Sequence, residues 1–316
     1  MLSYLHEFHA GNHADILKHL ALVFIFEHLN EKGKPYTFFD THAGAGLYRF
    51  DDERALKTGE SMRGIQRLLD YASRFPDDVP SEMQGYLSLV KKYAADGMYP
   101  GSPVIESDLL GNGSILVASE LHSAEFDVLQ KTMRGRAVQL HHRNGWEMLR
   151  ALTPPAIKRG AVLCDPSYEE KQDYTDAAKT LCDVHKKWPA ATLALWYPLL
   201  SYRNDVIQGM KDTIKQFVLG MNAHTEILDV PFCVDTEDSH IETTLDKSIG
   251  SAKPRLYGSG MFVVNPPWKL EEKLRRVLPF VAKALGCEEC ARFSDPTGRL
   301  MRTFVHHIIF EWLDFE

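Results

Sequence analysis

Short apolar runs alternate along the chain with longer, mostly amphipathic stretches. Seven of these runs have the length and the content of β-branched or aromatic residues that buried strands show. They are residues 36–40, 114–119, 137–141, 161–164, 192–196, 225–230 and 260–264. Helical stretches separate most of them, and such alternation is typical of a largely parallel sheet. The pattern therefore predicts a doubly wound, seven-stranded, Rossmann-like α/β fold.

Two further helices flank this pattern. Residues 268–285 predict a helix after the last strand. Residues 13–32 predict one before the first, because side chains recur at helical spacing near one face. These side chains are Ile16, Leu17, Leu20, Phe24 and His28.

Residues 52–100 break the alternation. They are polar, contain two helix-like pieces (about 60–73 and 82–95) and carry proline and glycine loop signals. We interpret them as a small helical insertion. The expected organisation is a main domain of residues 1–51 and 101–316, whose residues 1–35 form a cap and helix, with an inserted subdomain of residues 52–100.

Composition is that of an ordinary globular protein. Of the 316 residues, 44% are apolar and 25% are charged. No apolar run approaches the roughly 18 residues that a membrane helix needs. Residues 1–9 lack the basic and apolar regions of a signal peptide. We therefore expect a cytoplasmic protein with no membrane partner.

The net charge of −7 at pH 7 argues against a broad, histone-like grip on nucleic acid. A local basic patch suffices, however, for an enzyme that binds its substrate briefly. Candidates are Lys253-Pro254-Arg255 and Lys273-Leu274-Arg275-Arg276, each of which also fits a solvated surface. Cys287 and Cys290 form a lone C-x-x-C, which we interpret as free thiols rather than as a zinc or redox site.

The first strand ends in an acid and a glycine turn, Asp40-Thr41-His42-Ala43-Gly44-Ala45-Gly46. Glycine lets a backbone bend sharply and approach a ligand closely, and such a turn lies where doubly wound sheets bind ligands. The third glycine of the dinucleotide fingerprint is missing, which argues against NAD. Gly44 is therefore a candidate binding residue, although an ordinary strand-to-helix turn has the same pattern.

The next two strands also end in polar side chains. The carboxylate of Glu120 can accept hydrogen bonds from both hydroxyls of a ribose. Asn144, followed by Gly145, can read the amine and a ring nitrogen of an adenine. A helix terminus or an Asn-Gly turn explains each of them alone. Together, in this order, they indicate the nucleoside pocket of a methyltransferase that uses S-adenosylmethionine.

The fourth strand ends in Asp165-Pro166-Ser167-Tyr168. A residue before proline is kept out of the helical region, so Asp165 is expected to project its carboxylate into the mouth of the sheet. Pro166 adds a carbonyl acceptor, and the ring of Tyr168 can stack on a base. Two acceptors on an aromatic amine localise its lone pair, and a carboxylate relieves the charge that develops there. The loop predicts methylation of an exocyclic amine; a plain strand-end turn with a packed tyrosine is the alternative.

A second segment, Asn265-Pro266-Pro267-Trp268, matches the amino-methyltransferase pattern more closely. It follows the last strand, whereas the catalytic loop follows the fourth. We therefore interpret it as structural.

At this point several motifs together resemble the bacterial ribosomal RNA large subunit methyltransferase J family, over about residues 1–285. The longest is the N-terminal run, which contains Tyr4, His6, Phe8-His9-Ala10-Gly11-Asn12-His13-Ala14-Asp15 and Leu17-Lys18-His19. The others are Asp40-Thr41-His42-Ala43-Gly44-Ala45-Gly46, Tyr99-Pro100-Gly101-Ser102-Pro103, Leu195-Trp196-Tyr197-Pro198 and Asn265-Pro266-Pro267-Trp268-Lys269-Leu270.

The resemblance implies an enzyme that methylates N6 of one adenine in 23S ribosomal RNA, as a monomer acting on protein-free RNA or an early assembly intermediate. It implies Asp165 as the catalytic acceptor and Tyr4 as a substrate contact, with His6 and Lys18 near the active site. It implies cofactor contacts at His19, His42, Ser102, Glu120, Asn144, Gly145 and Asp165.

Two positions depart from the family pattern. Ser167 stands where the family has a second proline, and Asn144 stands where it has aspartate. We expect both changes to alter rate and affinity rather than reaction type. The alternatives are a methyltransferase for DNA adenine or protein glutamine, and a catalytically silent RNA-binding scaffold.

The N-terminal histidines match no standard zinc spacing, so we expect no metal site there. We expect them instead to form a lid over the cofactor, with Lys18 adding positive charge. These histidines are His6, His9, His13 and His19.

Overall fold

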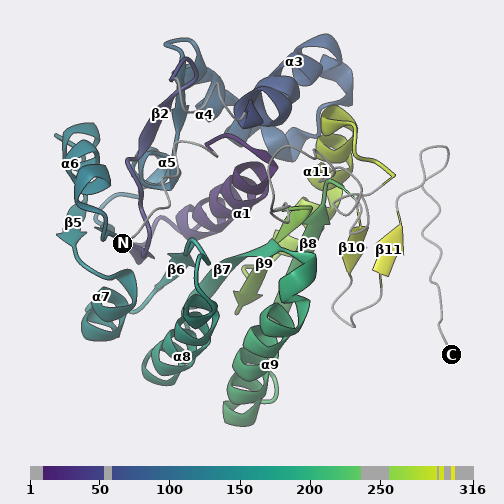
Figure 1. The fold of residues 1–316 in the computed structure, drawn as a ribbon. Coiled ribbons are helices and arrows are strands. Elements are labelled where there is room, and N and C mark those ends of the chain that lie inside the picture. Colours follow the sequence, from purple (N-terminus) through teal and green to yellow (C-terminus); the bar gives the residue numbers. More distant parts are fainter. Residues whose placement is uncertain (1–9, 53–58, 236–255, 290–291, 295–299, 303–316) are drawn as a thin grey trace, which may run out of the picture.

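The computed structural model describes residues 10–52, 59–235, 256–289, 292–294 and 300–302. At its centre lies a seven-stranded sheet with the order β5-β4-β1-β6-β7-β9-β8 (Figure 1). Six of these strands run in the same direction, and β9 runs in the opposite direction between β7 and β8. The predicted doubly wound α/β fold is confirmed, with every expected strand present. The strands are β1 (Thr37–Asp40), β4 (Ile115–Glu120), β5 (Gln139–His142), β6 (Gly160–Cys164), β7 (Thr192–Leu199), β8 (Ile227–Cys233) and β9 (Gly258–Val264).

Helices cover both faces of this sheet (Figure 1). Successive strand side chains point to opposite faces, so Phe38 belongs to the core under α1, α5 and α11, whereas Phe39 belongs to the core under α7, α8 and α9. The helices are α1 (His13–Asn30), α3 (Arg67–Arg74), α4 (Gln84–Ala94), α5 (Ser102–Leu109), α6 (Ser123–Thr132), α7 (Gly145–Leu152), α8 (Lys171–Lys187), α9 (Asn204–Met221) and α11 (Leu270–Leu285). Shorter elements are the π-helical turn η2 (Met62–Gln66) and the 3₁₀ turns η3 (Pro76–Asp78), η4 (Ser81–Met83) and η5 (Ser201–Arg203).

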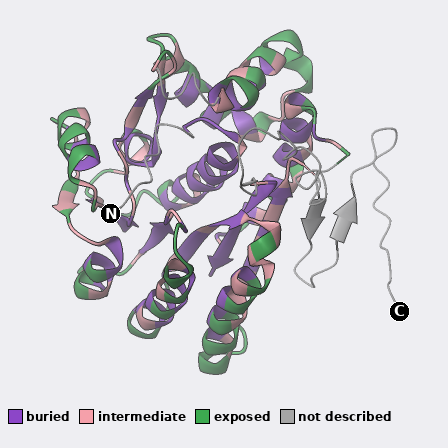
Figure 2. Cartoon of the chain, in the orientation of Figure 1, coloured by how far each residue is buried: buried purple, intermediate pink, exposed green. Residues whose placement is uncertain are grey.

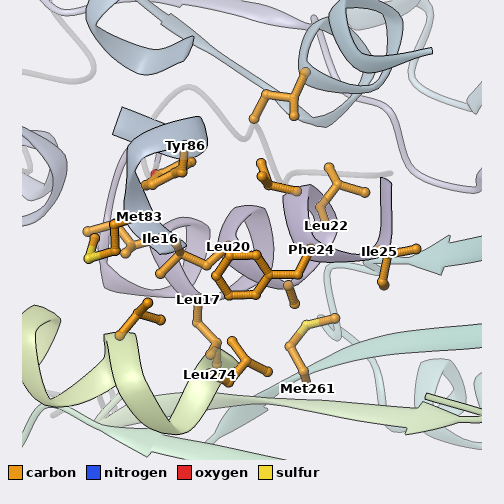
Figure 3. Close-up of a cluster of buried hydrophobic side chains, with 14 of the residues drawn as sticks. Ile16, Leu17, Leu20, Leu22, Phe24, Ile25, Met83, Tyr86, Met261 and Leu274 are labelled. Carbon is orange, nitrogen blue, oxygen red and sulfur yellow. The ribbon is translucent and has the colours of Figure 1, made fainter. Parts of the chain in front are cut away.

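Helix α1 passes through the core rather than along the surface. Its apolar side chains are buried on every side, which is what a helix that is hydrophobic all round requires. Figure 3 shows Leu20 and Phe24 between Tyr86 on one side and Leu274 and Met261 on the other. The expectation of one buried face was therefore too narrow, as the buried colour of the whole helix in Figure 2 also shows.

The segment between β2 (Leu47–Arg49) and β3 (Met98–Pro100) is helical, as the sequence predicts. These two strands pair antiparallel with each other, a short pairing that the sequence analysis did not predict. The apolar side chains of α3 and α4, including Leu68 and Tyr86, join the same core as α1 and α11. The segment 52–100 is thus attached to the rest of the fold through a shared core.

The Asn-Pro-Pro-Trp segment lies far from the end of β6. Because β9 is antiparallel, its last residue Val264 pairs with Leu193 near the start of β7. The side-chain amide of Asn265 donates to the carbonyls of Pro189 and Ala191, both at 2.8 Å. The segment therefore lies at the edge of the sheet opposite the carboxyl ends of the parallel strands, in agreement with a structural role.

The two basic segments that were candidates for an RNA-binding patch have different outcomes. The basic side chains Lys273, Arg275 and Arg276 form ion pairs with nearby glutamates, so this candidate RNA patch fits a solvated surface. The other candidate, 253–255, lies outside the described residues, as do Cys290 and most of the expected polar loop at 234–258.

The strands β10 (Arg292–Ser294) and β11 (Leu300–Arg302) pair antiparallel. In the part of the chain that the structure describes, none of the helices is long and apolar enough to cross a membrane.

Candidate active site

The carboxyl ends of β1, β4, β5 and β6 converge on one pocket. Its open space is about 990 Å³ with the solvent-facing mouth included. Open α/β sheets bind ligands at this edge. The structure brings most of the sequence-predicted site residues together in its wall: Lys18, His42, Gly44, Ser102, Glu120, Asn144, Gly145, Asp165 and Pro166.

The glycine turn is tied to the end of β4 through Glu120. Gly44 has a φ of 60°, which side chains other than glycine rarely adopt. A Cβ at this position would lie 2.3 Å from the hydroxyl of Tyr48. Glu120 accepts hydrogen bonds from the N–H groups of Gly44 (2.9 Å) and His122 (2.7 Å). These bonds hold the carboxylate against the pocket, with lone pairs left for a ligand diol.

Asn144 caps the N-terminus of α7. Its Oδ1 accepts hydrogen bonds from the N–H groups of Trp146 (2.9 Å) and Glu147 (3.1 Å). The next residue, Gly145, touches the turn after β1: a Cβ there would lie 2.0 Å from the carbonyl oxygen of Thr41. Only glycine allows α7 to begin so close to β1. The Asn oxygen that was expected to read an amine is already bound to the helix.

Two buried carboxyl groups lie beneath the glycine turn. Asp40 is fully buried and accepts hydrogen bonds from the Ser102 hydroxyl (2.7 Å) and the His42 N–H (3.1 Å). Burial raises the pKa of Asp40 to about 6, although both hydrogen bonds lower it. Glu106 is also fully buried, and burial followed by the nearby Asp40 raises its pKa well above the ordinary value. Burial beside a second carboxyl group thus favours the protonated form of Glu106.

His42 forms an uncharged wall of the pocket. Burial lowers its pKa to about 4, outweighing the opposite effect of Asp165, so the imidazole is neutral at pH 7. Its Nδ1 lies 2.7 Å from the Thr41 hydroxyl oxygen. The ring of Trp146 meets it edge-on, with the centroids 4.8 Å apart.

Lys18 connects the central helix to the catalytic loop. Its Nζ forms an ion pair with Asp165 and another with Asp15, the latter at 2.8 Å. Burial lowers the pKa of Lys18, but the two aspartates outweigh this effect and raise the pKa above its ordinary value. Lys18 is only 4% exposed. A permanent positive charge is thus fixed next to the carboxylate expected to act on the substrate amine.

Some side chains of the catalytic loop face the pocket, and one is buried in the core. Asp165, Pro166 and Ser167 line the pocket, whereas Tyr168 does not. The Tyr168 ring is 3% exposed and its hydroxyl donates to the Trp196 carbonyl at 2.9 Å. Its φ of 52° turns the ring inward, and Arg203 holds the loop by donating to the carbonyl of Tyr168 at 2.5 Å. The structure therefore places this ring away from the position expected for stacking on a base.

Three other predicted residues lie outside the pocket or outside the described chain. His19 is fully buried, with its Nδ1 2.8 Å from the Tyr99 hydroxyl oxygen, and it does not line the pocket. Tyr4 and His6 lie outside the described residues. The described part of the N-terminal run contributes Lys18 to the site.

Sequence reasoning missed several residues that shape the pocket. Tyr48 closes the space beside Gly44, and its hydroxyl accepts from the Ala45 N–H at 3.2 Å. Trp146 and Leu121 add apolar wall. Tyr48 lies two residues beyond a predicted motif, and Trp146 lies one residue beyond another. The available signal was therefore an aromatic residue shortly after a motif, which the core of a strand or helix also produces.

The arrangement suits a nucleoside ligand beside a reactive carboxylate. Glu120 supplies acceptors for a diol, the wall of Trp146 and Leu121 supplies apolar contact, and Asp165 supplies an oriented carboxylate. Among the described residues, no cluster of three or more His, Cys, Asp or Glu side chains could hold a metal ion. The chemistry available to these side chains is positioning and charge stabilisation.

Comparison with known proteins relates this chain to one family. The family model "Ribosomal RNA large subunit methyltransferase D, RlmJ" matches residues 33–294. Ribosomal RNA large subunit methyltransferase J of Escherichia coli (strain K12) is 36% identical over 294 residues, which cover 90% of this chain and 94% of that protein. The protein of the same name from Haemophilus influenzae is 34% identical over 292 residues, with the same coverage.

One solved structure has the same fold over most of its length. Protein LPL1258 from Legionella pneumophila matches with a TM-score of 0.71 and 25% sequence identity, covering 88% of this chain and 94% of that chain. The whole arrangement of sheet and helices is therefore shared with a solved protein.

Proposed function

Because the chain belongs to the ribosomal RNA large subunit methyltransferase J family, we propose that it transfers a methyl group from S-adenosylmethionine to the N6 amine of one adenine in 23S ribosomal RNA. The observation that carries this proposal is the position of Asp165. Asp165 lines the pocket, is paired with Lys18, and is followed by Pro166 in the same wall. A carboxylate and a carbonyl in that order suit an exocyclic amine.

The pocket fits S-adenosylmethionine on its own chemistry. Gly44 and Gly145 both line it, and the absence of a Cβ lets the turn after β1 pack against Tyr48 and lets α7 begin beside Thr41. Glu120 supplies acceptors for the ribose hydroxyls, and the carboxylates of Glu120 and Asp165 favour a cationic ligand. When bound, S-adenosylmethionine supplies an electrophilic methyl group on a positively charged sulfur.

The side chains then act on the substrate amine. Asp165 and the Pro166 carbonyl accept hydrogen bonds from its two hydrogens, which localises the lone pair on nitrogen. The Asp165 carboxylate stabilises the positive charge that develops as the nitrogen–carbon bond forms. Lys18 orients this carboxylate through their ion pair. We assign Tyr168 to anchoring the loop through Trp196 rather than to stacking.

The RNA substrate must present the adenine outside a stacked helix, because the amine has to reach the pocket mouth. Extrusion costs a few kcal/mol, least in single-stranded or bulged RNA. Protein-free 23S RNA or an early assembly intermediate offers such sites.

The test is methyl transfer from labelled S-adenosylmethionine to protein-free 23S RNA from cells that lack the endogenous enzyme. The RNA is digested and examined for N6-methyladenosine. We expect about one modified adenine per RNA with the wild type, none above background with Asp165→Ala, and the wild-type level with Asp127→Asn. Asp127 is exposed on α6 and outside the pocket, so it controls for loss of a carboxylate.

Parallel arms separate the alternatives. Transfer to duplex DNA or to protein glutamine with none to RNA would overturn the RNA assignment. Binding of the cofactor without transfer to any substrate would instead mark a silent scaffold, for which the departures Ser167 and Asn144 are the motivation. Wild-type activity in Asp165→Ala would overturn the role of the loop.

A further inference from the structure

The side-chain amide of Asn144 has only its donor half left for a ligand. An amide oxygen has two lone pairs, and Oδ1 of Asn144 accepts two hydrogen bonds, from the N–H groups of Trp146 and Glu147. Both donors are backbone groups of α7, so the oxygen is required on that side and the orientation of the amide is determined. The Nδ2 group is the part of the side chain that remains.

The backbone next to Asn144 also offers a donor. Gly145 is the first residue of α7, and its N–H has no acceptor within the helix. Gly145 lines the same pocket as Asn144. The positive end of the helix dipole lies at this point as well. This side of the pocket therefore presents donors and positive potential, and it favours acceptors on a ligand.

This polarity suits only half of the edge of an adenine. That edge carries an amine, which donates, beside a ring nitrogen, which accepts. A 6-keto purine such as hypoxanthine reverses both groups, with an acceptor oxygen in place of the amine and a donor N–H in place of the ring nitrogen. Donors on the protein therefore pair with the ring nitrogen of adenine but oppose its amine, whereas they pair with the keto oxygen of hypoxanthine but oppose its ring N–H. The apolar side chains of Trp146 and Leu121 contact either ring alike.

We propose that Asn144 makes the nucleobase site of this protein nearly indifferent between adenine and a 6-keto purine. The inference rests on the proposed function, because it assumes that the pocket holds the nucleoside of S-adenosylmethionine. An aspartate at this position would keep one oxygen on the α7 cap and turn the second oxygen, an acceptor, toward the amine. The presence of Asn rather than Asp therefore sets base selectivity and weakens binding of the adenosyl ligand.

The experiment is calorimetric titration of the full chain with S-adenosylhomocysteine and with its 6-keto analogue, S-inosylhomocysteine. We expect the wild type to discriminate by less than about fivefold. We expect Asn144→Asp to bind the adenosyl ligand about tenfold more tightly and to prefer it over the inosyl ligand by about thirtyfold or more, since one good hydrogen bond in place of a clash is worth about 1–3 kcal/mol.

Asn222→Asp is the matched control. Asn222 accepts the His224 N–H at 3.1 Å in a similar local turn, follows α9 and lies outside the pocket. It adds the same charge, so its two affinities should equal those of the wild type. The ratio of the wild-type affinities for the adenosyl and inosyl ligands is a second test, and it does not depend on the folding of any variant.

The outcomes separate the two proposals. Wild-type preference for the adenosyl ligand by thirtyfold or more, or an unchanged ratio in a folded Asn144→Asp, would overturn the role of Asn144 while leaving the cofactor assignment intact. Failure of the wild type to bind either ligand would overturn the cofactor assignment, and the inference with it.

Discussion

Substitution of Gly145 by alanine tests how closely α7 is fitted to β1. Within a helix, alanine is preferred to glycine by about 1 kcal/mol, so a local argument predicts stabilisation. The structure predicts the opposite. The new Cβ would lie 2.0 Å from the Thr41 carbonyl oxygen and 2.8 Å from its carbon, and neither atom belongs to a flexible side chain.

The magnitude follows from the displacement that the contact requires. Ordinary carbon–oxygen contacts begin near about 3.3 Å, so α7 must retreat by more than 1 Å. Overpacking of this kind costs about 1–3 kcal/mol. After the helix preference of about 1 kcal/mol is subtracted, we expect the free energy of unfolding to fall by up to about 2 kcal/mol. Asn144 moves with the helix, so affinity for S-adenosylhomocysteine should fall by about tenfold.

The assay is urea unfolding with linear extrapolation, together with calorimetry. The control is Gly209→Ala in the middle of α9, where no atom lies within 4 Å of the new Cβ. It should raise the free energy of unfolding by about 0.4–1 kcal/mol. If Gly145→Ala is as stable as the wild type while Gly209→Ala behaves as expected, the steric argument is wrong.

Three further predictions concern charge and hydrogen bonding at the site. Lys18→Met should lower the free energy of unfolding by about 3–5 kcal/mol because it leaves two aspartates without their buried cation, whereas Lys92→Met, which removes an exposed ion pair, should cost at most about 1 kcal/mol in the same urea assay. Burial raises the pKa of Asp40 from 3.8 to about 6. Between pH 4 and 6, Asp40 therefore keeps its proton in the folded state but loses it in the unfolded state. The free energy of unfolding falls as the pH rises through this range. Asp40→Asn should remove up to about 3 kcal/mol of this fall between pH 4 and 6; parallel urea–pH curves for the two proteins would contradict the assignment. Tyr168→Phe should cost about 1–3 kcal/mol, since the buried Trp196 carbonyl loses its donor; a variant with wild-type stability would show that the ring is not held there.

Several central strands of this fold were predictable because the sheet is buried on both faces there. Such a strand is a continuous apolar run, as in Ala161–Cys164, and a plain count of such runs finds it. The three-residue pair of β2 and β3 is too short to leave a pattern. The all-round burial of α1 was missed for a different reason: its partners come from the insertion, β9 and α11, all distant in sequence.

Within the site, the residues at strand ends were predictable and their partners were not. Topology alone brings Glu120 and Asp165 to one edge. The acceptor that draws the hydroxyl of Tyr168 into the core belongs to β7, and local sequence does not reveal it. Likewise, an Asn before a helix is equally able to cap it or to face a ligand. Only the structure shows that the oxygen of Asn144 caps α7.

The central position of α1 also bears on the order in which the chain is made. This apolar helix leaves the ribosome well before the core side chains that cover it, which include Met261 and Leu274. At about 5–20 residues per second, some ten seconds to a minute separate the synthesis of Phe24 from that of its partners. During that interval the helix is an exposed apolar segment, and a nascent chain of this design depends on early shielding by chaperones to avoid aggregation.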